Sequence, residues 1–74
     1  MDEPTNDIKR ILIEQKLAQW RNTLYDAMID ARVAAKFADA KLPQAEQMIE
    51  AAKQRIKQCE IAIEVLQAEL DALA

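Results

Sequence analysis

Pro43 interrupts a helical pattern that otherwise runs through most of the chain. On both sides of it, apolar residues recur at alternating spacings of four and three, the heptad pattern of helices that pack on one another. The first series is Ile13, Leu17, Trp20, Leu24, Ala27, Ala31, Ala34 and Ala38. The second is Ala45, Ile49, Ala52, Ile56, Cys59, Ile63, Leu66, Leu70 and Leu73. The sequence therefore predicts two long helices.

The phase of the two series permits either one continuous rod or a hairpin. Inside a helix, a proline removes a hydrogen bond and clashes with the preceding turn, at a cost of roughly 3 kcal/mol. At the first position of a new helix it costs almost nothing. A chain that turns at Lys41 and Leu42 therefore accommodates Pro43 better than a rod does, and a hairpin is predicted.

Folding the chain at this point pairs the two series in antiparallel layers whose residue numbers sum to 83. Trp20 then meets Ile63, and several layers set a small side chain against a large one, which suits close packing. The positions that flank the layers give an independent check, because the register is defined by apolar residues alone and makes no use of charge. On these flanks the register pairs Lys16 with Glu69, Asp30 with Arg55, Phe37 with Met48 and Arg21 with Glu60, with no like-charged pair.

The predicted fold is an all-α, antiparallel, coiled-coil-like hairpin in a single domain, residues 1–74. We expect a flexible N-terminus over residues 1–5, a helix over about 6–39, a turn over about 39–42 and a helix over about 43–73. Thr5 or Asn6 is suited to cap the first helix. No glycine is present to end that helix in the usual left-handed conformation. The predicted core of the hairpin consists of Ile13, Leu17, Trp20, Leu24, Ile49, Ile56, Cys59, Ile63, Leu66 and Leu70.

A chain of 74 residues seldom buries enough apolar surface to fold alone without a disulfide, a metal or a partner. Cys59 has no second cysteine to pair with, histidine is absent, and the acidic residues lack calcium-loop spacing. Self-association is the remaining means of stabilisation, so we expect a four-helix bundle or a larger helical oligomer. No metal, cofactor or small molecule is implied.

Several apolar residues lie outside the hairpin seam; most of them point away from the partner helix, and Phe37 and Met48 make the flank near the turn apolar. A helix that is apolar on two faces usually has two neighbours. We therefore expect an oligomer or partner interface formed by Tyr25, Ile29, Val33, Phe37, Met48, Ile61 and Val65. The sequence leaves open whether this surface binds a second copy of the chain or the helix of a different protein.

The composition excludes most catalytic machinery. Without glycine there is no phosphate-binding loop, and without serine or histidine the common nucleophile and base pairings are missing. A carboxylate-based enzyme remains the least favoured class. Neither a secretory segment nor a membrane span is expected, so a cytoplasmic location is predicted.

The favoured function is protein–protein contact, as an adaptor, an assembly chaperone or a small inhibitor. The architecture resembles that of small coiled-coil accessory proteins from phages and bacterial secretion systems, although no motif here identifies one of them. The alternative is a regulatory hairpin dimer that binds RNA, with the basic stretch Lys53, Arg55 and Lys57 as its candidate contact. A net charge of −3 and basic side chains that point in different directions disfavour nucleic acid.

Overall fold

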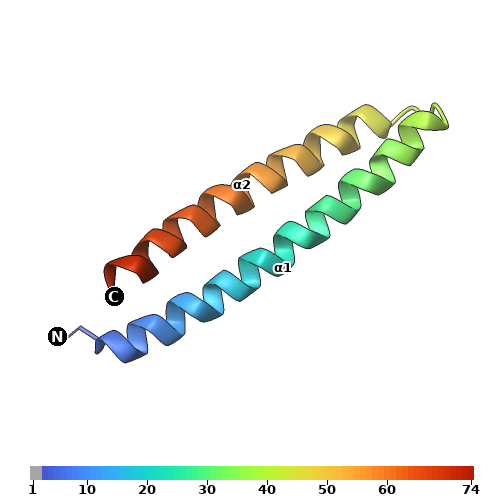
Figure 1. Ribbon diagram of the computed structural model, residues 1–74. Helices are drawn as coiled ribbons and strands as arrows, with labels where there is room; N and C mark the ends of the chain where they lie inside the picture. Colours follow the sequence, from blue (N-terminus) through green and yellow to red (C-terminus); the bar gives the residue numbers. More distant parts are fainter. Residues whose placement is uncertain (1–2) are drawn as a thin grey trace.

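The computed structural model describes residues 3–74 and is an antiparallel hairpin of two helices, as predicted (Figure 1). Helix α1 spans Asn6–Asp39 and helix α2 spans Ala45–Ala72. The molecule measures 56 × 21 × 13 Å, so it is long and only one helix thick. The two chain ends lie at one end of the hairpin and the turn lies at the other (Figure 1). Each helix therefore has a single neighbour, and its remaining faces are open.

Thr5 caps the N-terminus of α1. Its hydroxyl oxygen accepts a hydrogen bond from the backbone N–H of Ile8 at 3.3 Å, which satisfies one of the free donors of the first turn. Just before it, Nζ of Lys9 donates to Oε2 of Glu3 at 2.9 Å, and this bond lowers the pKa of the Glu3 carboxyl. Of the N-terminal segment predicted to be flexible, residues 1 and 2 lie outside the described part of the chain, whereas Glu3 and Thr5 make these contacts.

The turn ends α1 without a glycine. Lys41 takes the left-handed conformation, with φ of 61°, that glycine usually supplies. The N–H of Leu42 donates to the carbonyl of Phe37, and the N–H of Lys41 donates to that of Ala38. These are the two hydrogen bonds of a Schellman motif, and Phe37 and Leu42 line a common groove as the apolar pair that accompanies it.

Helix α2 begins at Ala45, two residues later than predicted, and Pro43 belongs to the turn. The N–H of Ala45 donates to the carbonyl of Leu42 at 3.2 Å, which closes a four-residue turn with Pro43 at its second position. The fixed φ of proline suits that position. Gln44 precedes the helix with φ of −99° and ψ of 1°, and its side chain makes no capping hydrogen bond.

The core of the hairpin is narrow and is made mostly of small side chains. The buried residues are Leu17, Ala27, Ala34, Ala45, Ala52 and Cys59. The larger residues of the predicted core lie along the same seam but are only half-buried: Ile13, Trp20, Leu24, Ile49, Ile56, Ile63, Leu66 and Leu70. Small side chains let the helices approach closely, yet two helices alone leave the large side chains partly open to solvent.

Candidate protein–protein interface

Large apolar side chains are exposed mainly on one of the two helices. Among the described residues, α1 carries eight of the eleven exposed large hydrophobic residues, α2 carries two and the turn carries one. The eleven are Ile8, Ile11, Leu12, Tyr25, Met28, Ile29, Val33, Phe37, Leu42, Ile61 and Val65. Single exposed hydrophobic residues are common on proteins, but here most of the exposed apolar surface lies on one helix, α1.

The outer face of α1 is defined here as the helical positions that point away from α2. In its first part it consists of Ile8, Ile11, Leu12, Gln15, Ala18, Gln19, Asn22 and Tyr25, all exposed. None of these side chains is charged, in a chain in which 31% of residues are charged. The second part adds Ile29 and Val33, which are 40% and 42% exposed, together with the charged residues Arg32, Lys36 and Asp39. A helix face that only met water would carry charges, so this composition favours contact with another helix.

A second apolar surface lies near the turn, on one side of the hairpin. One shallow groove is lined by Asp30, Val33, Met48, Ala51, Ala52 and Arg55. A neighbouring groove is lined by Phe37, Leu42, Pro43, Gln44, Ala45 and Met48. Because Met48 belongs to both, the two grooves form one surface, which we call the turn-end groove. It brings together three of the residues predicted for the interface, Val33, Phe37 and Met48.

The other predicted interface residues lie elsewhere. Tyr25, at 60% exposure, and Ile29 belong to the outer face of α1. Ile61 and Val65, both more than half exposed, lie on the outer side of α2. The seven residues therefore do not form one surface, and Met48 is half-buried on the flank of the hairpin, where it lines a groove together with Phe37. Ile8, Ile11 and Leu12, absent from the predicted set, extend the outer face of α1 toward its N-terminus.

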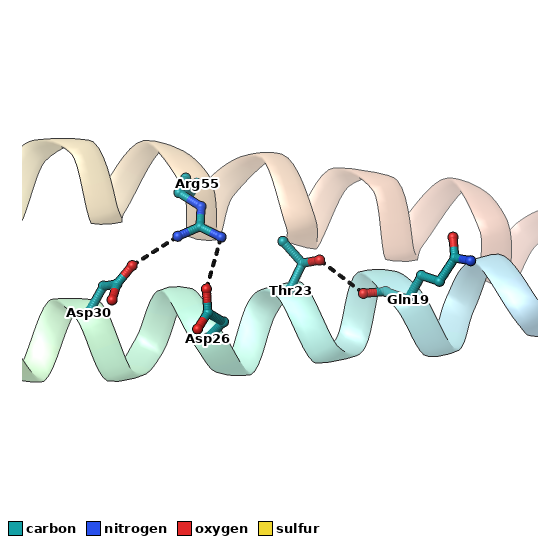
Figure 2. A network of polar contacts seen from close by, with 5 residues as sticks. All are labelled: Gln19, Thr23, Asp26, Asp30 and Arg55. Atoms are coloured by element: carbon teal, nitrogen blue, oxygen red, sulfur yellow. Dashed lines mark hydrogen bonds and ion pairs between the residues drawn. The ribbon is translucent and has the colours of Figure 1, made fainter.

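Arg55 joins the two helices at the edge of the turn-end groove (Figure 2). Its Nη1 atom donates to Oδ2 of Asp30 at 2.9 Å, and Nη2 donates to Oδ2 of Asp26 at 3.2 Å. The pair with Asp30 is the one that the register predicts. The second carboxylate was missed, although Asp26 precedes Asp30 by four residues and therefore lies on the same helical face.

The other predicted flank ion pairs are not formed. Within the part of the chain that the structure describes, no ion pair joins Lys16 to Glu69 or Arg21 to Glu60. Such pairs between long exposed side chains gain little, because side-chain entropy and solvent screening offset the attraction. Arg55 differs because its planar guanidinium reaches two carboxylates from one position.

The candidate basic contact for nucleic acid is partly neutralised by neighbouring acids. Arg55 lies between two carboxylates, and Nζ of Lys53 is 3.8 Å from Oε1 of Glu50. Farther along the hairpin, Lys9 and Arg10 also have acidic neighbours, Glu3 and Asp7. Phosphate binding requires basic groups that are free to replace counterions, and these contacts compete with it.

The surface of the hairpin is large for its mass. The chain exposes 5916 Å², whereas a compact monomer of 8.4 kDa exposes about 4600 Å². The excess, about 1300 Å², is larger than the roughly 800 Å² that each partner contributes to a stable interface of standard size.

In the described part of the chain, neither helix is long and apolar enough to cross a membrane.

No protein-family model, no curated protein and no solved structure matches this chain.

Proposed function

We propose that this protein acts without catalysis, as a helical hairpin that self-associates and works through protein–protein contact. The observation that carries the proposal is the outer face of α1, where apolar side chains are exposed and no charge occurs from Ile8 to Tyr25. A helix with one apolar face against α2 and a second one in solvent is incomplete as a monomer.

Two further features support self-association. The large residues of the hairpin seam are only half-buried, so the two helices of one chain do not complete a core by themselves. The excess surface of the chain is ample for a standard dimer interface. An assembly of this kind suits an adaptor or an assembly chaperone, which presents helical surface to a client, or a small inhibitor, which covers the surface of its target.

Sedimentation equilibrium over micromolar concentrations tests this function. We expect the wild-type chain to be a dimer or a larger oligomer. Replacing Ile29 and Val33 together by aspartate places two charges in the apolar surface and should lower the affinity at least tenfold, with the helix content by circular dichroism retained.

The matched control replaces Gln54 and Gln58 by aspartate in the first, polar half of the outer side of α2. It adds the same charge and should leave the assembly unchanged. A wild-type chain that remains a folded monomer at every concentration would exclude self-association. Loss of helix content in the Ile29 and Val33 variant, but not in the control, would instead show that these residues belong to the core.

A further inference from the structure

We propose that two copies of the chain pair through the outer faces of their α1 helices, in antiparallel orientation, with Ala18 of each copy against Ile29 of the other. The inference rests on the proposed self-association and adds to it the helix, the direction and the register. In this arrangement the two α1 helices lie at the centre of the dimer and the two α2 helices lie outside.

A second copy is the occupant that fits the charge of this face. The chain carries a net charge of −3, so two copies repel least where the surfaces that meet carry few acidic groups. On the outer face of α1, charges occur only beyond Tyr25, at Arg32, Lys36 and Asp39; Asp26, at the edge of this face, is paired with Arg55 of α2. Two basic residues and one acidic residue leave this face with little net charge, so it repels its own copy less than the acidic remainder of the chain does.

The position of the charges along α1 sets the direction. In a parallel pair, Arg32 and Lys36 of one copy would lie beside the same residues of the other, and like charges at such positions are destabilising. In an antiparallel pair, the charged half of each face lies on the uncharged half of the other. Lys36 then meets Ile11, along which its aliphatic stem can pack, and Arg32 meets Gln15.

The register follows from the same kind of layer counting that pairs α1 with α2. When paired residue numbers sum to 47, the overlap runs from residue 8 to residue 39, nearly the whole of α1. Ala18 then faces Ile29 of the second copy, so a small side chain meets a large one. Asn22 faces Tyr25, which offers a hydroxyl to the amide. On the flanks of these layers the paired residue numbers sum to 45 or 49, and there Leu12 meets Val33.

Registers displaced by one heptad are worse. With a layer sum of 40, flank residues whose numbers sum to 42 meet, which sets Arg21 beside Arg21 of the second copy. With a layer sum of 54, flank residues whose numbers sum to 52 meet, which sets Asp26 beside Asp26 of the second copy. A sum of 33 shortens the overlap and leaves Ile29 without a helical partner. Only the sum of 47 combines full overlap with no like-charged pair.

Disulfide cross-linking tests the pairing directly. In a full-length chain carrying Cys59→Ala, cysteine is introduced in separate variants as Ala18→Cys and Ile29→Cys. After mixing and oxidation, we expect a covalent dimer that contains one chain of each variant. Each variant alone should give none, because identical positions lie 11 residues apart along the paired helices, about 16 Å, well beyond the reach of a disulfide. Leu12→Cys mixed with Val33→Cys is a second pair that should also cross-link.

The outcomes separate this inference from the proposed function. Cross-linking in the mixtures alone supports the antiparallel register. A variant that cross-links with itself overturns it, and so does a dimer in sedimentation that cross-links in neither mixture; self-association stands in both cases. A chain that sediments as a monomer overturns the register and the proposed function together.

Discussion

Nη1 of Arg55 lies 2.9 Å from Oδ2 of Asp30, although the two residues are 25 positions apart in the sequence. This contact joins the middle of α2 to α1 and is possible in only a narrow range of registers. A shift of α2 by one heptad would move Arg55 about 10 Å along α1 and beyond reach of Asp30. The ion pair therefore reports the register, whatever it contributes to stability.

The contribution of this pair to stability should be small. Both side chains are exposed, Arg55 at 41% and Asp30 at 56%. A double-mutant cycle with Arg55→Gln and Asp30→Asn should give a coupling free energy of about 0.2 to 1 kcal/mol, which added salt reduces. Urea unfolding of the four proteins measures it at a fixed protein concentration, since assembly also affects the midpoint. A coupling well above this range would mean that assembly buries the pair.

Ala34 should tolerate no larger side chain, in contrast to its neighbour Ala35. Ala34 is fully buried between the helices and Ala35 is exposed. Ala34→Leu should destabilise the hairpin by about 1 to 3 kcal/mol, because the added atoms force the helices apart. Ala35→Leu changes the same atoms with similar helix propensity and should stay within about 0.5 kcal/mol of wild type. Equal effects in chemical denaturation would contradict the position of the seam.

Lys41 should be replaceable by glycine with a gain in stability. Its φ of 61° is costly for a residue with a Cβ atom and costs glycine nothing. Lys41→Gly should raise the free energy of unfolding by about 0.5 to 1 kcal/mol. Lys41→Ala keeps the Cβ atom and serves as the control, with no comparable gain expected. If glycine lowers the thermal midpoint, the Schellman motif does not end α1 as described.

Thr5 should matter through its hydroxyl. Thr5→Ala removes the oxygen that accepts from the N–H of Ile8 and should cost about 1 kcal/mol. Thr5→Ser keeps the oxygen and should be close to neutral. Backbone amide exchange in the first turn of α1 gives an independent measurement, because loss of the cap should speed exchange there before it affects the centre of the helix. Equal exchange in both variants would show that the cap adds nothing.

The hairpin could be predicted because the apolar spacing and Pro43 point to the same answer. The spacing defines two seams, and the flank charges agree with one register, of which the pair Asp30 and Arg55 is confirmed. The predicted start of α2 was wrong by two residues, because proline is favoured both in a β-turn and at the first position of a helix. The left-handed conformation of Lys41 could not be predicted, because nothing in a lysine favours it over a shifted helix end.

The candidate interface was harder to predict than the fold. Heptad positions correctly place Tyr25, Ile29 and Val33 on the exposed side of α1. The flank register also pairs Phe37 with Met48, and both line the groove beside the turn. It does not show that Leu42 and Pro43 line the same groove, because their position depends on the path of the turn. The strongest signal is the run of uncharged outward positions from Ile8 to Tyr25. The predicted interface omits the N-terminal part of this run, Ile8, Ile11 and Leu12, because it was chosen from apolar residues without regard to where charges are absent.

Because α1 and α2 end together at the open end of the hairpin, a stretching force applied to the two termini would act across the helix pair (Figure 1). The layers would then separate one after another, beginning with Ile13 and Leu70 and finishing at the turn. Because only one layer of side chains resists the force at a time, the isolated hairpin should open at low force, whatever its thermal midpoint.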